Sequence, residues 1–168
     1  KYFAGLPFYR QSSIQKLLGV KITASTVFDQ VELVCNDIYP VYQLLFNLAS
    51  DAKHYSLDDT TNRILDAKAV IKKARNSDKV RTRTGVYTSG VIATLADNRE
   101  IVLFETNIGH AGEFIDSILH KRSQSCAKPL IMSDALASNR PTVRDATTSL
   151  CNSHARRQFV DVINHFPE

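Results

Sequence analysis

The sequence predicts an α/β domain preceded by a lobe of helices. Up to about residue 52, apolar residues recur every three or four positions, which is the period of an amphipathic helix. From residue 53 the period changes, and short apolar runs alternate with helical segments, as in a sheet covered by helices. The 168 residues, 43% of them hydrophobic, can bury one medium-sized core. We therefore predict an N-terminal helical lobe over 1–52 and an α/β domain over 53–168.

The lobe is predicted to hold a short helix, a turn and a longer helical segment. The first helix runs over 11–18 and ends at Gly19, because glycine is favoured after the last turn of a helix. Thr23 or Ser25 can cap the next segment, and Pro40 is expected to kink or break it. Apolar residues at helical spacing in this segment are Val27, Val31, Val34, Ile38, Val41, Leu44, Leu45 and Leu48. Such helices can read a DNA groove, although an amphipathic pair more often serves packing alone.

The first half of the α/β part is predicted to contain three strands. A short strand over 53–58 precedes a charged segment over 66–79, which is expected to be either helical or mobile. Strands over 85–95 and 99–106 then form a hairpin, because the Asp-Asn pair between them suits a tight turn. The second and third strands are therefore antiparallel.

The second half is predicted to alternate helices and strands. A helix over 111–121 leads to a compact apolar strand over 129–133, typical of a buried parallel strand. A short helix over 142–150, a last strand at 150–152 and a helix over 155–163 follow. This order predicts a ribonuclease H-like mixed five-stranded sheet flanked by helices. In that fold the first and fourth strands lie side by side at the centre of the sheet.

Two aspartates lie at the ends of these two central strands. Asp58 closes the first strand and Asp134 follows the fourth. A carboxylate at such a position costs folding free energy unless it is solvated, hydrogen-bonded or bound to a metal, so the pair suggests a shared divalent cation. Metal ions held in this way commonly act on phosphodiesters. Taken singly, each aspartate can equally be an ordinary residue at the end of a strand.

Charge and cysteine content narrow the class of protein. A formal charge of +4 and a pI near 9.0 favour a polyanionic partner, although many proteins with this charge bind none. The three cysteines show no CxxC spacing, which fits a reducing cytoplasm better than a disulfide framework. No apolar run is long enough for a membrane span. Because the chain begins at Lys1 and stops in a helical pattern, we expect it to be a piece of a larger protein.

Four blocks together resemble the central region of the insertion sequence sixty-six family of DDE transposases. They are Gly5-Leu-Pro-Phe-Tyr-Arg-Gln11, Leu57-Asp58-Asp59-Thr60, Ser133-Asp134-Ala135, and Cys151 with His154-Ala-Arg-Arg-Gln-Phe159. The resemblance implies a bacterial, nucleoid-associated enzyme of the cytoplasm that cuts DNA and transfers strands with Mg2+ or Mn2+. It implies that two aspartates and a glutamate hold the metal, and that Asp58 and Asp134 are the aspartates.

The chain departs from the family pattern at three points. The family usually has Asp-Glu-Thr-Pro where residues 58–61 read Asp-Asp-Thr-Thr, and an aromatic residue where Asn152 stands. The resemblance places the third acid on a later helix, beyond residue 168. Asp161 is a possible substitute, or simply an aspartate facing water.

Other polar residues near these blocks have two interpretations each. Asp59 and His154 are expected beside the metal ligands rather than among them. Cys151 and His154 have a spacing that suits zinc, but no second pair of ligands accompanies them, which favours a buried thiol and a histidine at a helix start. His110 and Glu113 match the family's helix start, where capping and packing also explain them.

Basic residues suggest where DNA would bind. Arg156 and Arg157 begin the last helix and can pair with phosphates or face water. The segment 68–83 holds seven basic residues and one acid, so it suits backbone phosphate or is a solvated loop. The candidate DNA contacts are Arg156, Arg157, Lys72, Lys73, Arg81 and Arg83.

Three functions follow from the sequence. The first is a DNA transposase, for which a homo-oligomer is expected because two DNA ends must be held together. The second is a non-catalytic DNA-binding or assembly module of a degenerate element. The third is a ribonuclease H-like nuclease or resolvase.

Overall fold

The computed structural model describes residues 5–64, 67–73, 80–142 and 145–166. The chain forms two compact units, residues 1–44 and residues 45–168. The predicted boundary at residue 52 stays a prediction. Among the described helices, none has both the length and the apolar character needed to cross a membrane.

The first unit contains α1 (Phe8–Leu17) and most of α2 (Ala24–Ala49). Gly19 follows α1 with a φ of 83°, a left-handed conformation that glycine adopts without steric cost. The hydroxyl of Thr23 accepts a hydrogen bond from the N–H of Thr26 at 3.1 Å and so caps α2. The predicted helix end at Gly19 and the predicted cap at Thr23 are both confirmed. A break at Pro40 is not found, because α2 runs through it as one helix of 26 residues.

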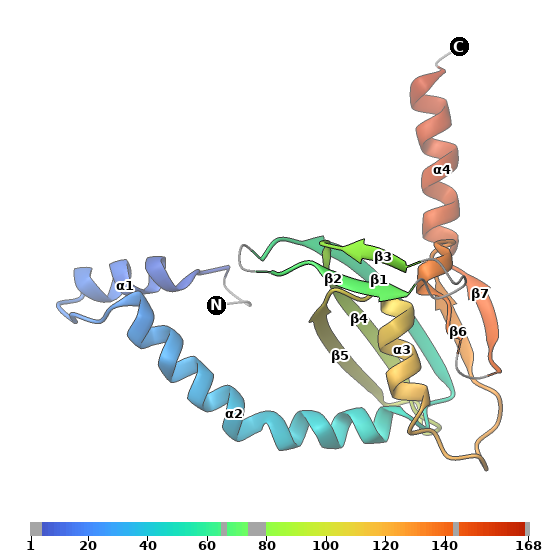
Figure 1. The fold of residues 1–168 in the computed structure, drawn as a ribbon, viewed down its shortest axis with the longest axis horizontal. Helices are drawn as coiled ribbons and strands as arrows, with labels where there is room; N and C mark the ends of the chain where they lie inside the picture. The colour runs from blue at the N-terminus through green and yellow to red at the C-terminus, as the bar shows by residue number, and fades with distance from the viewer. Residues whose placement is uncertain (1–4, 65–66, 74–79, 143–144, 167–168) are drawn as a thin grey trace. The chain divides into compact units, whose positions relative to one another are not determined.

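The second unit is built on a five-stranded sheet with the strand order β5-β4-β1-β6-β7 (Figure 1). Its strands are β1 (His54–Asn62), β4 (Val86–Thr94), β5 (Glu100–Asn107), β6 (Leu130–Ser133) and β7 (Thr147–Leu150). The pairs β1–β4 and β4–β5 are antiparallel, whereas β1–β6 and β6–β7 are parallel. This order and these directions confirm the predicted ribonuclease H-like fold. The turn between β4 and β5 contains Asn98 at a φ of 67°, as its sequence predicts.

Two predicted segments contain strands in the structure. In the segment 66–79, expected to be helical or mobile, Val70–Lys73 form β2, which pairs with β3 (Val80–Arg83). Residues 66 and 74–79 of that segment lie outside the described residues. The helix expected over 142–150 is also wrong, because its second half is β7. The only helical turn described between β6 and β7 is η1 (Ala137–Asn139).

Contacts with residues distant in the sequence explain why the helix predicted over 142–150 is wrong. The carboxylate of Asp116 accepts hydrogen bonds from the N–H and the hydroxyl of Thr142, at 2.8 and 2.7 Å. The chain is therefore tied to α3 (Ala111–Leu119) at the point where the helix was expected to start. Beyond it, Thr147 to Leu150 pair with β6 instead. α4 (Asn152–His165) then begins directly after β7, where 150–152 was expected to be a strand.

The core lies between the sheet and α3. One face of α3 buries Phe114, Ile115, Ile118 and Leu119. The strands contribute buried residues that alternate along each strand: Tyr55, Leu57, Val91, Ala93, Ile101, Leu103 and Ile131. The other face of the sheet is more open, and Phe104 there is 64% exposed.

A buried arginine joins the segments around the start of β1. The guanidinium of Arg122 donates to the carbonyl oxygens of Ser50, Ala52 and Ala127 at 2.7 to 2.9 Å. It also lies 3.3 Å from the hydroxyl of Tyr55. Burial raises the pKa of Tyr55 to about 12, so this hydroxyl remains protonated and can donate to the carbonyl of Ala49 or Ser50.

Replacing this arginine should destabilise the fold. Arg122→Met removes the donors of three carbonyl groups in a buried setting, and we expect the free energy of unfolding to fall by about 3 kcal/mol. Urea denaturation followed by circular dichroism measures the change. Arg99→Met is the control, because Arg99 is exposed and is paired only with Asp97 across the hairpin turn. Equal losses in both variants would contradict the structural role of Arg122.

Candidate functional site

The two predicted acids lie on β1 and directly after β6, which are neighbouring strands of the sheet. Ser56 of β1 pairs in parallel with Met132 of β6. β1 continues to Asn62, so Asp58 pairs with Gly90 in the middle of the strand, and the prediction that it closes the first strand is wrong. Asp134 directly follows Ser133, the last residue of β6. Each aspartate comes two residues after a paired residue, Ser56 of β1 or Met132 of β6, so the parallel pairing carries both toward the carboxyl end of β6.

Asp58 is the more open of the two. Its side chain is 63% exposed, and its Oδ1 accepts a hydrogen bond from the N–H of Asp59 at 2.9 Å. Its Oδ2 lies 3.9 Å from Nε2 of His154. Asp58 lines a hollow of about 300 Å³ on the open face of the sheet, together with Phe104, Met132, His154 and others. A solvated carboxylate of this kind is available to a cation or a solvent-borne ligand.

Asp134 is half-buried and is held by the segment that follows it. Its Oδ1 accepts hydrogen bonds from the N–H of Leu136 at 3.1 Å and from Nδ2 of Asn139 at 3.0 Å. Asn139 is completely buried in η1, and its Oδ1 has no hydrogen-bond partner among the described residues. The sequence analysis did not identify Asn139, because a single asparagine in an Ala-Ser-Asn turn carries no recognisable signal. It fixes the orientation of the Asp134 carboxylate.

Asp59 faces the other side of β1 from Asp58, as alternation along a strand requires. Only 10% of its side chain is exposed. Its Oδ2 lies 2.9 Å from Nδ1 of His110 and accepts a hydrogen bond from the N–H of Ala111 at 3.3 Å. The ring of His110 also contacts Tyr87, with 4.0 Å between centroids. Asp59 therefore caps α3 from the neighbouring strand and fixes β1 to that helix.

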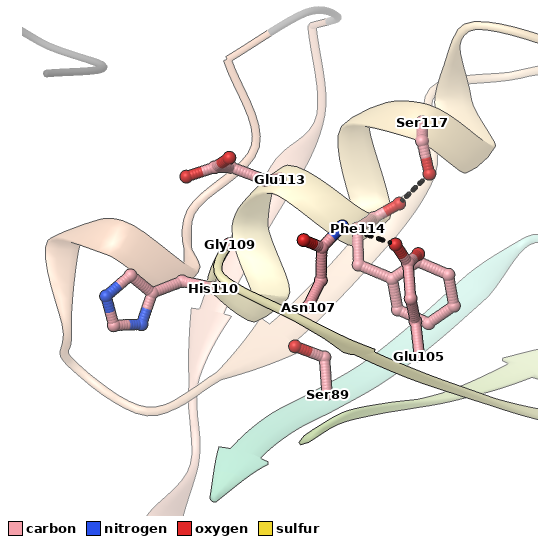
Figure 2. Close-up of a pocket in the computed structure, with 8 residues that line it drawn as sticks. All are labelled: Ser89, Glu105, Asn107, Gly109, His110, Glu113, Phe114 and Ser117. Carbon is pink, nitrogen blue, oxygen red and sulfur yellow. Dashed lines mark hydrogen bonds between the residues drawn. The ribbon is translucent and has the colours of Figure 1, made fainter. Parts of the chain in front are cut away.

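A second hollow, of about 190 Å³, lies beside the start of α3 (Figure 2). Figure 2 shows the amide of Asn107 turned toward the carboxylate of Glu105, and the two are hydrogen-bonded at 2.9 Å. A Cβ at Gly109 would lie 2.9 Å from the carboxylate of Glu113, so a larger residue here would displace the end of that side chain. Neither of the two candidate metal ligands lines this hollow. It is a structural feature of the α3 start rather than part of the site around the two aspartates.

Cys151 and His154 form an interacting pair at the start of α4. The side chain of His154, helped by the N–H groups of His154 and Ser153, lowers the pKa of the Cys151 thiol to about 7, although Nδ1 of His154 has no hydrogen-bond partner among the described residues. The same interaction raises the pKa of His154, and the negative charge of Asp58 adds to the effect. Cys151 is also bonded to the end of β6, next to Asp134, because its N–H donates to the carbonyl of Ser133 at 2.8 Å.

The predicted basic residues lie on two different elements. Arg156 and Arg157 are exposed on α4, within its first two turns. Lys72 pairs with Arg81 across the β2–β3 hairpin, and Lys73 pairs with Val80. Arg83 of the same hairpin forms an ion pair with Glu113 of α3, in which both side chains are about four-fifths buried. That pair anchors the hairpin to the helix and partly neutralises Arg83.

The carboxylates of the two aspartates match part of what a divalent metal requires. Asp58 and Asp134 offer the hard oxygen ligands that Mg2+ and Mn2+ prefer. Among the described residues, however, no cluster of three or more His, Cys, Asp or Glu side chains could hold a metal. Asp161, the possible third acid, is exposed on α4. The two aspartates therefore fit the ion as an incomplete ligand set.

The lowered pKa of Cys151 predicts an unusual alkylation profile. In a Cys35→Ser, Cys126→Ser background, the rate of reaction with iodoacetamide should be half-maximal near pH 7, because the thiolate is the reactive form. His154→Gln should move this midpoint upward, toward the ordinary value of 9.0, since the main stabilising interaction is lost. Rates measured from pH 5 to 10 by mass spectrometry test this. A midpoint unchanged by His154→Gln would contradict the assignment of the cause.

Comparison with known proteins gives one match. Residues 1–167 match the model of the family described as Transposase IS66 family. No curated protein and no solved structure matches the chain. The match spans both compact units and includes the two aspartates, the Cys151–His154 pair and the arginines of α4. The chain belongs to the IS66 family of transposases, as a DDE transposase domain.

Proposed function

We propose that this chain carries two metal-binding aspartates, Asp58 and Asp134, of a DNA transposase that cuts DNA ends and joins them to a target. The observation that carries the proposal is the parallel β1–β6 register, which carries Asp58 and Asp134 toward the carboxyl end of β6. Family membership supplies the reaction class. As a transposase of bacterial DNA, the protein would work in the cytoplasm on nucleoid DNA.

The proposed roles of the two aspartates differ because their surroundings differ. Asp58 is open to solvent and can reach an ion at the mouth of the site. Asp134 has one oxygen held by Leu136 and Asn139, which leaves its carboxylate pre-oriented. When bound, Mg2+ or Mn2+ would activate the attacking hydroxyl group and stabilise the departing 3′-oxygen. Asp59 and His110 support the site by fixing β1 to α3.

DNA binding is proposed for the exposed arginines next to these aspartates. Arg156 and Arg157 lie one turn or less beyond His154, whose imidazole approaches Asp58. A phosphate near the metal site is therefore within reach of the same helix. Lys72, Lys73 and Arg81 of the hairpin are proposed as further phosphate contacts, with Arg83 holding the hairpin to α3. A homo-oligomer is proposed because strand transfer needs two DNA ends held together.

A non-catalytic assembly module is the second candidate. The observation in its favour is that residues 59–61 read Asp-Thr-Thr where the family usually has Glu-Thr-Pro, directly beside the first proposed metal ligand. In that case DNA binding would persist without metal-dependent cleavage.

Removing either proposed metal ligand should abolish transposition. We expect Asp58→Asn and Asp134→Asn each to lower the frequency of transposition by about 100-fold or more, the scale for losing one group that stabilises the transition state. Cleavage of end-containing DNA with Mg2+ or Mn2+ and titration of Mn2+ by calorimetry measure activity and metal binding separately. Asp97→Asn is the matched control, because Asp97 lies on the β4–β5 turn, at the opposite end of the sheet. Full activity in both site variants would refute the assignment; DNA binding that survives both substitutions, without any cleavage by the full-length transposase, would favour the assembly module.

The α4 arginines should contribute to DNA affinity through charge. For the double variant Arg156→Gln/Arg157→Gln we expect weaker binding to all DNA sequences. The magnitude of the slope of log K against log salt concentration should fall by roughly 2. Fluorescence anisotropy from 50 to 300 mM salt measures both quantities. Arg99→Gln is the control for a lost exposed arginine, since Arg99 lies on the far hairpin turn. An unchanged slope in the double variant would show that α4 does not contact phosphate.

A further inference from the structure

α2 exposes an unusual amount of apolar surface. Every residue from Phe28 to Val41 is exposed, and the helix has no buried residue before Ala49. Val34, Ile38 and Val41 are each 55–57% exposed. An apolar stripe along a helix normally faces another element. Within the first unit, the described residues leave this stripe uncovered.

The spacing of the stripe identifies the kind of surface that it fits. Its residues follow one another at alternating intervals of four and three: Val27, Val31, Val34, Ile38 and Val41. The same alternation continues in the sequence through Leu45 and Leu48. A strict period of 3.5 residues is the signature of packing against another long helix, with these residues at the a and d positions of a heptad. We call the set from Val27 to Val41 the α2 seam.

The distribution of charge allows a copy of the same helix to approach. α2 contains three acids and no lysine or arginine. Asp29 and Glu32 occupy heptad positions f and b, which point away from the seam, and Asp37 alone flanks it. Pro40 falls at position c, on the outer side, so its ring does not enter the seam. Two identical helices can therefore meet along the seam with Asp37 as the one charged residue of each helix beside the contact.

Other helices of this chain suit the seam less well. The exposed apolar residues of α4 lie between Phe159 and Phe166, about two turns, whereas the seam extends over four turns of α2. α1 contacts α2 through Phe8 and Phe28, whose rings meet edge to face with 5.9 Å between centroids, beside the seam rather than on it. A second α2 has the same length, spacing and charge.

We propose that α2 is a dimerisation helix, and that two copies of this chain pair through the α2 seam. A symmetric dimer of this kind uses the same surface on both subunits. This proposal rests on the proposed function only for the reason that a dimer is needed, which is that strand transfer holds two DNA ends together. The interface itself is inferred from α2. Oligomeric state is measured without DNA or metal, so a failure of this inference is distinguishable from a failure of the catalytic assignment.

The test compares charges placed on and off the seam. Val34→Asp, Ile38→Asp introduces two charges at neighbouring seam positions, and Asn36→Asp, Gln43→Asp introduces two at position f on the outer side. Sedimentation velocity and light scattering of the whole chain should show a concentration-dependent dimer for the unmodified protein and for the outer variant. The seam variant should be a monomer at all concentrations tested. Circular dichroism checks that helix content is retained.

A second set of variants, with alanine in place of aspartate, controls for misfolding of the charged variants. Val34→Ala, Ile38→Ala keeps α2 helical, because alanine favours helix more than valine or isoleucine does. It should weaken the dimer at least tenfold in Kd, whereas Asn36→Ala, Gln43→Ala should not. A monomeric unmodified chain, or a dimer equally stable in seam and outer variants, would overturn the proposal.

Discussion

The parallel pairing of β1 with β6 is the interaction on which the rest of the second unit depends. It sets the register that relates Asp58 to Asp134, and β7 brings Cys151 to the same end of β6. The pairing is secured where β1 begins, since the N–H of Leu130 donates to the carbonyl of Lys53 at 3.0 Å and Arg122 binds the carbonyls around it. A slip of one residue would turn every side chain of β1 to the opposite face, and with it the aspartates.

Alternation along β1 gives two adjacent aspartates different chemistry. Asp58 faces the open side of the sheet, near His154 and Cys151, where its carboxylate is exposed. Asp59 faces α3, where His110 and the first N–H of the helix occupy its carboxylate. The carboxylate of Asp58 is thereby left accessible, and that of Asp59 holds β1 against α3. The contacts of Asp59 also explain how this part of β1 stays ordered although Asp58 itself makes few contacts.

Elements with strong local signals were predicted well from the sequence. The Gly19 terminus, the Thr23 cap and the β4–β5 hairpin all depend on residues within a few positions of each other. The hairpin of β2 and β3 and the strand β7 were missed because their partners decide them: Val70 pairs with Arg83, and Thr147 with Leu130. Asn139 was missed for a related reason, since its role depends on a hydrogen bond to Asp134 that the sequence does not reveal.

The sequence by itself determined the order of most elements and the family resemblance with its two aspartates, because periodicity and short motifs are local properties of the chain. Only the tertiary structure decided that Asp58 lies within β1, which face each acid occupies, and that Arg83 is paired with Glu113. These properties arise from contacts between residues far apart in the sequence or on different elements. Electrostatic and hydrogen-bond energies depend on the distances across such contacts, which composition and spacing do not contain.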